Sequence, residues 1–222
     1  MEHNKKILVT GAAGFIGSNL VKFLNIKGIT PYVYDPKLTI SEQWKNLAGL
    51  NFIMVFSPFQ YADYDAVVHL GANSATTSPM SKELFDNNFE FSKSLFNAHG
   101  GKFIYASSAA TYGAEEKDFA ERIDGLKPTN AYGFLKLHFD KWISKNEEPA
   151  RNFIGLRFFN VYGPGEKFKG DMASVVHKAL NKSKPIHAYK NNPPECKGDI
   201  DCAWHLFQSE REGVNSEAIR RD

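Results

Sequence analysis

The sequence predicts an α/β fold in which a doubly wound parallel sheet is covered by helices on both faces. Short apolar segments alternate with longer segments of helical periodicity, and a glycine-rich turn joins the first such pair. The 222 residues fit one large domain, or one domain with part of a second. Because 42% of the residues are hydrophobic, the chain can form a sizeable core.

The expected strands and helices alternate along most of the chain. Strands are expected at residues 7–10, 29–35, 51–56, 65–71, 102–107 and 152–159, and helices at 15–27, 81–98, 130–145 and 171–182. The first helix has Ile16, Leu20 and Leu24 on one face, and Gly28 stands where a helix commonly ends. Residues 37–50 carry no clear pattern, and the alternation stops after the breaker cluster at 191–194.

Charge and cysteine content argue against several classes of function. Lys plus Arg number 27 and Asp plus Glu 25, so the net charge of +2 gives no basis for binding nucleic acid or a membrane surface. No apolar run of about 18 residues is present, so we expect no membrane span. Cys196 and Cys202 lack a metal-like set of partners, and we therefore expect free thiols, no metal site and a cytoplasmic protein.

The glycine-rich turn predicts a dinucleotide site. Gly11, Gly14 and Gly17 follow a strand and open an amphipathic helix. In this arrangement the first glycine permits a tight turn, the second lets a pyrophosphate approach the backbone, and the third lets helix and strand pack closely. The N-terminus of the helix then offers N–H groups and a partial positive charge to the phosphates.

Asp35 ends the second expected strand, where a carboxylate can accept hydrogen bonds from the adenosine ribose. Taken alone, this position favours NAD over NADP; the alternative is a turn carboxylate before Pro36. Lys37 is close enough to pair with a 2′-phosphate, although a solvated surface lysine is the better interpretation.

Ser108, Tyr132 and Lys136 form a candidate catalytic set. Ser108 follows a strand, and Tyr132 and Lys136 are spaced i and i+4 on a helix, so they share a face. An ammonium beside a phenol is expected to lower the pKa of the tyrosine, and a serine hydroxyl can orient a substrate oxygen. A Tyr-x-x-x-Lys spacing often occurs by chance, so the hydride-transfer interpretation depends on its occurrence together with the glycine turn.

Longer runs resemble the nucleotide-sugar branch of the extended short-chain dehydrogenase/reductases, a group with a Rossmann-type sheet and a small C-terminal substrate domain. Residues 86–88, 105–113, 157–164 and 169–175 carry the resemblance, which covers roughly residues 5–190. The run from Lys169 through Met172 to Val175 is the most selective, and it is similar to the ADP-L-glycero-D-manno-heptose 6-epimerases.

The resemblance implies an isomerase that uses NADP, with NAD as the alternative. Its substrate would be a nucleotide sugar, ADP-D-glycero-D-manno-heptose, which is converted to the L-glycero form by transient oxidation at C6″ for the lipopolysaccharide inner core. Tyr132 and Lys169 would be the two opposed acid/base groups, and Ser108 and Lys136 would complete the catalytic set. The family also implies a homo-oligomer.

The remaining site residues are carried over by matching positions. Cofactor contacts are implied for Gly11, Gly14, Phe15, Ile16, Gly17, Asp35, Gly71, Ala72, Ser74, Asn87, Lys136, Val161 and Lys169. Substrate contacts are implied for Ser108, Asn160 and Asp171.

The chain departs from the family pattern toward its end. Asp171 stands where the family has a serine, and a carboxylate beside an anionic nucleotide sugar is unfavourable unless it is paired. Gly198 takes the place of a phosphate-binding arginine, after which the match ends. We therefore expect an NADP-binding domain at residues 1–165, the start of a substrate-binding region at 166–194, and at 195–222 a diverged or out-of-frame tail.

Two alternative functions stay open at this point. One is another nucleotide-sugar epimerase or a 4,6-dehydratase, although Ala109 and Ala110 stand where a dehydratase would need an acidic pair. The other is a catalytically weak NADP-binding remnant, which the shortened substrate domain favours.

Overall fold

The computed structural model describes residues 5–61, 63–114, 119–145, 152–181 and 217–219, with Asp171 described by its backbone alone. The expectations for Cys196, Gly198 and Cys202 therefore lie outside the described residues. Within the described part of the chain, no helix is long and apolar enough to cross a membrane.

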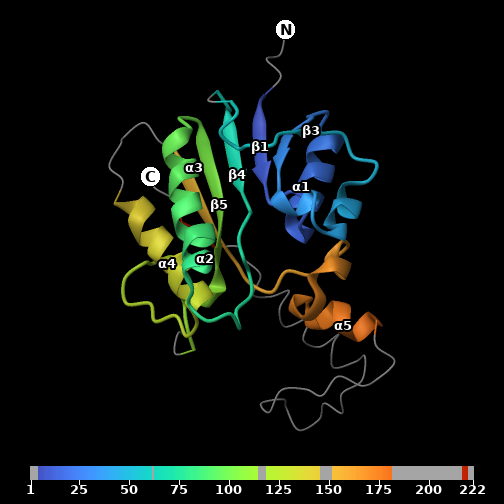
Figure 1. The fold of residues 1–222 in the computed structure, drawn as a ribbon. Coiled ribbons are helices and arrows are strands. Elements are labelled where there is room, and N and C mark those ends of the chain that lie inside the picture. Colours follow the sequence, from blue (N-terminus) through green and yellow to red (C-terminus); the bar gives the residue numbers. More distant parts are fainter. Residues whose placement is uncertain (1–4, 62, 115–118, 146–151, 182–216, 220–222) are drawn as a thin grey trace.

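A single sheet organises the described residues (Figure 1). Its strands lie in the order β3 (Ile53–Met54), β2 (Tyr32–Tyr34), β1 (Ile7–Thr10), β4 (Ala66–His69), β5 (Lys102–Ser108), β6 (Phe153–Phe158) and β7 (Glu217–Ile219). The first six strands pair in parallel, and β7 pairs antiparallel to β6. The predicted parallel α/β fold is confirmed.

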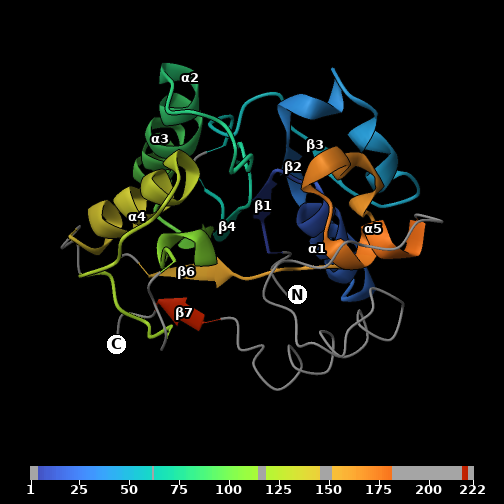
Figure 2. The same cartoon turned by 90° about the horizontal axis from the view of Figure 1, so that it is seen from below.

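Helices cover both faces of the sheet (Figures 1 and 2). Helix α1 (Phe15–Ile26) lies on one face, and α2 (Lys82–Phe85), α3 (Phe91–Ala98) and α4 (Ala131–Ser144) lie on the other. A π-helical turn, η3 (Asp86–Glu90), joins α2 to α3, so residues 82–98 form one nearly continuous helix, as expected. Short 3₁₀ helices are η1 (Pro36–Leu38), η2 (Glu42–Leu47), η4 (Ala109–Thr111) and η5 (Glu166–Met172), and α5 (Val175–Asn181) follows.

Alternation along β1 separates two apolar cores. Leu8 packs in a cluster with residues of α3 and α4 such as Leu95 and Leu135. Its neighbour Val9 packs in a second cluster with Val21 of α1. Successive side chains of a strand point to opposite faces, so each face of β1 is buried under a different helical layer. This two-sided burial explains why the strand reads as an uninterrupted apolar segment.

Some predicted boundaries are wrong, most clearly at the helix expected over 171–182. The 3₁₀ helix η5 ends at Met172, Ala173 is extended, and Gly170 adopts φ +55°. Helix α5 begins only at Val175, where the hydroxyl of Ser174 accepts a hydrogen bond from the backbone N–H of His177 at 3.0 Å. A capping serine thus resets the helix start, and the sequence pattern did not separate η5 from α5.

Candidate active site

The carboxyl ends of β1 and β4 meet at the switch point of the sheet. From β1 the chain crosses to β2 on one side, whereas from β4 it crosses to β5 on the other. Gly11 leaves β1 with φ +67°, and a Cβ added there would lie 2.6 Å from the backbone nitrogen of Gly71, which follows β4. The two loops therefore touch through their backbones, at the position where parallel sheets bind ligands.

The same turn opens α1 toward the carboxyl edge of the sheet. Gly14 is the N-cap residue and provides no side-chain hydrogen bond to the first helical turn. The helix start can therefore direct its N–H groups at an anion. A Cβ on Gly17 would lie 2.2 Å from the carbonyl oxygen of Gly11, so the helix approaches the turn as closely as a glycine allows.

Asp35 binds the glycine-rich turn directly. One oxygen of its carboxylate accepts a hydrogen bond from the backbone N–H of Ala13 at 3.0 Å, and the other accepts from that of Lys37 at 2.9 Å. Asp35 is therefore a turn carboxylate as well as a residue at the expected cofactor edge. The side chain of Lys37 is exposed, in keeping with a solvated lysine. Contact of Asp35 with a cofactor ribose stays a prediction.

A chain of hydrogen bonds supports the loop after β4. The hydroxyl of Thr10 accepts from the N–H of Gly71 at 3.3 Å and lies 2.7 Å from Nδ1 of His69, whose Nε2 lies 2.8 Å from the hydroxyl of Ser92. Burial lowers the pKa of His69 to about 3, so the ring is neutral. The bonds form one consistent series when Thr10 donates to Nδ1 and the protonated Nε2 donates to Ser92.

Asn88 holds this loop, whereas a contact of its neighbour Asn87 with a cofactor stays a prediction. Its buried amide accepts from the N–H of Asn73 at 2.8 Å and donates to the carbonyl of Asn73 at 2.9 Å. The side chain of Asn87 is exposed. Sequence reasoning missed Asn88, although its position four residues after the buried Leu84 placed it on the inward face of the helix.

The structure brings Ser108, Tyr132 and Lys136 together beside this edge. Ser108 ends β5 and lies beside the hydroxyl of Tyr132, which is in the first turn of α4. The ammonium of Lys136 lies 5.9 Å from the centroid of the Tyr132 ring and donates to the carbonyl of Ala106 at 2.7 Å. A hydroxyl, a phenol and a buried amine thus share one corner between β5 and α4.

The expected lowering of the Tyr132 pKa is wrong for this structure. Burial raises the pKa of Tyr132 above its ordinary value, and the hydrogen bond with Ser108 opposes that rise. Burial also lowers the pKa of Lys136 to about 8, although the nearby Asp140 carboxylate partly counteracts it. The Lys136 ammonium is directed at a backbone carbonyl, which the i, i+4 spacing could not reveal.

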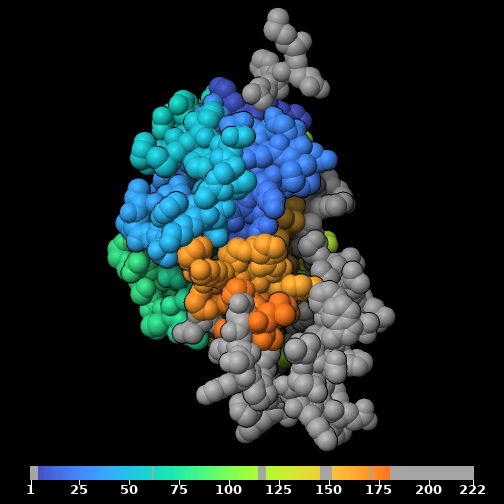
Figure 3. Space-filling view, turned by 90° about the vertical axis from the view of Figure 1, so that its right-hand side faces the viewer, coloured from blue at the N-terminus to red at the C-terminus, as the bar shows by residue number. Residues whose placement is uncertain are grey.

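The loop that carries Lys169 is attached to α1 and η2. Asn19 of α1 donates to the carbonyl of Pro164 at 2.8 Å, and Asn46 of η2 donates to that of Gly165 at 3.4 Å. The Lys169 ammonium lies 5.3 Å from the centroid of the Phe15 ring, which belongs to the glycine-rich turn. Figure 3 shows the orange segment that contains η5 packed against the blue N-terminal part, where η5 contacts α1.

Glu166 joins the two ends of this loop through hydrogen bonds. Its buried carboxylate accepts hydrogen bonds from the N–H of Gly163 at 2.8 Å and from the N–H and hydroxyl of Ser174 at 2.6 and 2.9 Å. These donors, together with the charge of Lys169, lower the pKa of Glu166 although its burial acts to raise it. The loop therefore has a fixed shape, with Lys169 beside Phe15 at the start of α1.

The other residues with predicted cofactor or substrate contacts lie around the same edge, and their side chains are exposed or partly buried. Asn160 and Ser74 are exposed, and Val161 and Ala72 are partly buried.

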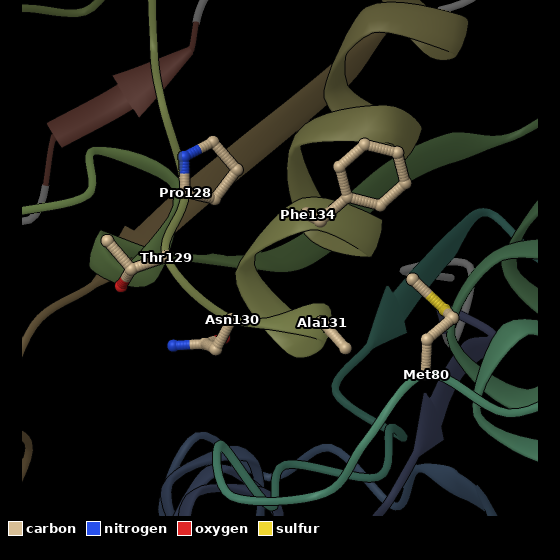
Figure 4. A pocket seen from close by; sticks show the side chains of 6 residues that line it. All are labelled: Met80, Pro128, Thr129, Asn130, Ala131 and Phe134. Atoms are coloured by element: carbon tan, nitrogen blue, oxygen red, sulfur yellow. The ribbon is translucent and has the colours of Figure 1, made fainter.

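An open cavity of about 410 Å³ lies at the start of α4, lined by Met80, Pro128, Thr129, Asn130, Ala131 and Phe134 (Figure 4). It shares no lining residue with the Ser108–Tyr132–Lys136 group. Among the described residues, no group of three or more His, Cys, Asp or Glu side chains could hold a metal ion.

The 3-2-1-4-5-6 strand order, the glycine turn at its switch point and the Ser–Tyr–Lys group define a dinucleotide-binding protein of the extended short-chain dehydrogenase/reductase type. The chain belongs to the NAD dependent epimerase/dehydratase family, whose model matches residues 7–194.

Solved structures of epimerases are similar to this chain. The ADP-L-glycero-D-manno-heptose-6-epimerase of Helicobacter pylori is 28% identical with a TM-score of 0.68, covering 81% of this chain and 63% of that one. The UDP-N-acetylglucosamine 4-epimerase of Methanobrevibacter ruminantium, in complex with UDP-N-acetylmuramic acid, is 26% identical with a TM-score of 0.68, covering 80% and 62%. The UDP-glucose 4-epimerase of Thermus thermophilus, in complex with NAD, is 25% identical with a TM-score of 0.60, covering 72% and 56%. This chain thus spans less than two thirds of the length of each.

Proposed function

We propose that this chain is a nucleotide-sugar epimerase that converts ADP-D-glycero-D-manno-heptose to the L-glycero form with a bound nicotinamide dinucleotide. The observation that carries the proposal is that Ser108, Tyr132 and Lys136 lie together at the carboxyl edge of the sheet, the same edge that carries the glycine-rich turn. The selective run from Lys169 to Val175 supports the heptose, and NADP is the proposed cofactor.

The residues present fit a dinucleotide. At Gly11 and Gly17 the backbones of the turn, of α1 and of the loop after β4 pack so closely that an added Cβ would collide with them, and the start of α1, which has no side-chain cap, completes this proposed dinucleotide cradle. Phe15 and Lys169 lie together beside it, and Lys136 lies with Tyr132 near the end of β5. A bound nicotinamide would supply the means of taking a hydride from the sugar carbon and returning it, so that the reaction has no net oxidation.

The chain's own groups would manage the proton. Tyr132 would take the proton of the sugar hydroxyl as its carbon is oxidised, and Ser108 would hold the same oxygen through a hydrogen bond. Tyr132 would therefore act from its phenolate form, which Lys136, buried and cationic below about pH 8, would stabilise. After the keto sugar has rotated, Lys169 would donate a proton to the oxygen in its new pose, and exchange of protons with solvent would return Tyr132 and Lys169 to their starting states.

A second candidate is a 4-epimerase acting on UDP sugars. The specific observation in its favour is that the heptose epimerase and the UDP-N-acetylglucosamine 4-epimerase match this chain with the same TM-score of 0.68. The sheet and the Ser–Tyr–Lys group serve either reaction, and the Lys169 loop is the feature that favours the heptose.

The decisive assay incubates the purified chain with ADP-D-glycero-D-manno-heptose or UDP-glucose, each with NADP⁺ or NAD⁺, and follows the sugar configuration by NMR. Inversion at C6″ of the heptose supports the proposal, and inversion at C4 of the glucose supports the second candidate. Dinucleotide binding without conversion of either sugar would overturn both and favour a cofactor-binding remnant.

Tyr132→Phe is the matched variant for this assay. It removes the proton-transferring hydroxyl and keeps the ring, so we expect the epimerisation rate to fall by about 10² to 10⁴-fold. Dinucleotide affinity, measured by nucleotide fluorescence, should stay within about twofold because the glycine turn is untouched. A variant that retains full activity would rule out Tyr132 as an acid/base group.

A further inference from the structure

Asp140 is a buried carboxylate one helical turn beyond Lys136, and the mechanism above does not use it. Its side chain is fully buried. One oxygen accepts from the hydroxyl of Tyr105 at 2.9 Å, and the other accepts from the hydroxyl of Ser107 at 2.8 Å and from Arg157 at 3.5 Å. Donors on both oxygens are the pattern expected of an ionised carboxylate, which accepts and does not donate.

The charges around Asp140 are unbalanced. Burial raises the pKa of the Asp140 carboxyl, and the Ser107 and Tyr105 hydroxyls together with two buried cations, Arg157 and Lys136, oppose that rise. Arg157 also stacks on the ring of Tyr112 at 4.8 Å, so its position is fixed by packing as well as by charge. A buried cation is costly unless an opposite charge lies nearby, and the Asp140 carboxylate therefore lowers the cost of burying both cations.

Asp140 also ties together the two elements that form the catalytic corner. It belongs to α4, whereas Tyr105 and Ser107 belong to β5 and directly precede Ser108. The ammonium of Lys136 donates to the carbonyl of Ala106 in the same stretch. Helix and strand are thus bonded at three successive strand residues, immediately before the serine that contacts Tyr132.

We propose that Asp140 is a positioning residue, whose buried carboxylate keeps Lys136 charged and fixes the end of β5 against α4. It touches neither the proposed substrate site nor the dinucleotide cradle and acts through Lys136 and Ser108. The inference rests on the proposed function in one respect, that Lys136 serves the reaction as a cation.

If the Asp140 carboxylate keeps Lys136 charged, its removal should change the pKa of Lys136 measurably. Burial lowers the pKa of Lys136, and Asp140 is the group that raises it again. The titratable and charged groups that face Lys136 are Asp140 and Tyr132 on its own helix and His69 on β4, and those that face its partner Asp140 include Tyr105 on β5 and Arg157 on β6. Of these, Asp140 is the anionic one, so Lys136 should lose its proton at lower pH when the carboxylate is removed.

The test follows the titration of Lys136 by NMR in protein labelled with ¹³C at lysine Cε, where the variant Lys136→Arg assigns the signal by its loss. In Asp140→Asn, which keeps the shape and removes the charge, the midpoint should fall by about one pH unit or more. Tyr105→Phe is the matched control because it removes a donor to the same carboxylate and keeps the charge, so the midpoint should stay where it is.

A second variant covers a failure to fold, since Asp140→Asn leaves Arg157 buried without its partner. Asp140→Asn combined with Arg157→Met removes both charges, and the midpoint should again fall. An unchanged midpoint in either folded variant would overturn the inference.

In the Asp140 variants, the alkaline limb of the pH profile of the epimerisation rate should move by the same number of pH units as the midpoint of the Lys136 titration. If neither the parent chain nor any variant epimerises a sugar, the proposed function fails. A shifted Lys136 titration would still support the role of Asp140 in keeping Lys136 charged. Titration in the absence of substrate and cofactor thus separates the two conclusions.

Discussion

At the residue scale, the room for a side chain differs sharply between Gly17 at the start of α1 and Gly28 past its end. A Cβ at Gly17 would meet the carbonyl oxygen of Gly11 at 2.2 Å, and the obstacle is backbone that cannot rotate away. Gly28, past the end of α1, has φ +74° and open space around its Cα. Both positions favour glycine: Gly17 because α1 packs against the proposed dinucleotide cradle, and Gly28 because its backbone is left-handed.

We therefore expect Gly17→Ala to abolish dinucleotide binding and to lower the free energy of unfolding by about 1–3 kcal/mol, since α1 must move off the turn. Gly28→Ala should cost about 1 kcal/mol through its left-handed backbone and leave affinity unchanged. Fluorescence titration with NADPH and NADH, together with urea denaturation, measures both quantities. Full-strength binding by Gly17→Ala would show that the turn is not the cofactor cradle.

At the scale of an element, α4 arranges the candidate site. Tyr132, Lys136 and Asp140 are spaced by four residues, so all three lie along the face that meets β5. On the exposed side, Phe134 stacks on His138 with ring centroids 6.0 Å apart. The helix starts at a defined residue because the side chain of Asn130 accepts from the N–H of Gly133 at 2.8 Å.

Removing this cap should loosen the first turn of α4, which holds Tyr132. Asn130→Ala is expected to lower the free energy of unfolding by about 1 kcal/mol, whereas Asn130→Asp should retain the stability because a carboxylate also caps. Urea denaturation of the three proteins provides the comparison. Equal stability of Asn130→Ala and the parent chain would contradict a capping role.

At the scale of the whole molecule, one neutral histidine joins several layers. His69 of β4 bonds Thr10 of β1 and Ser92 of α3, and its ring lies near Phe91 and Phe103. Burial lowers its pKa to about 3, from an ordinary histidine value of 6.5. Below pH 6.5 the unfolded chain binds a proton at this residue that the folded protein does not, so stability is lost as the pH falls toward 3.

The free energy of unfolding should therefore fall on acidification more steeply in the parent chain than in His69→Gln, which cannot titrate. Between pH 6.5 and 4, the excess loss is expected to be on the order of 3 kcal/mol. Urea denaturation at a series of pH values measures it. Parallel pH profiles for the two proteins would show that His69 titrates in the folded state as it does in the unfolded chain.

Local patterns in the sequence were enough for the order of the elements, the parallel sheet and the spacing of Tyr132 and Lys136. Each depends on residues close together in the chain: apolar periodicity marks strands and helices, and glycines at 11, 14 and 17 mark the turn. The fold class was confirmed for this reason, as was the family. The assigned roles of the site residues stay predictions.

Only the tertiary structure decided which groups are buried together. It buried Asn88 against the loop at Asn73, started α5 at Val175, and directed Lys136 at the carbonyl of Ala106. It also raised the pKa of Tyr132, because the cost of burying a charge depends on every element packed around the group. The sequence by itself determined that this chain carries a glycine turn and a Tyr-x-x-x-Lys helix, whereas burial and charge at their meeting point depend on contacts between strands and helices far apart in the chain.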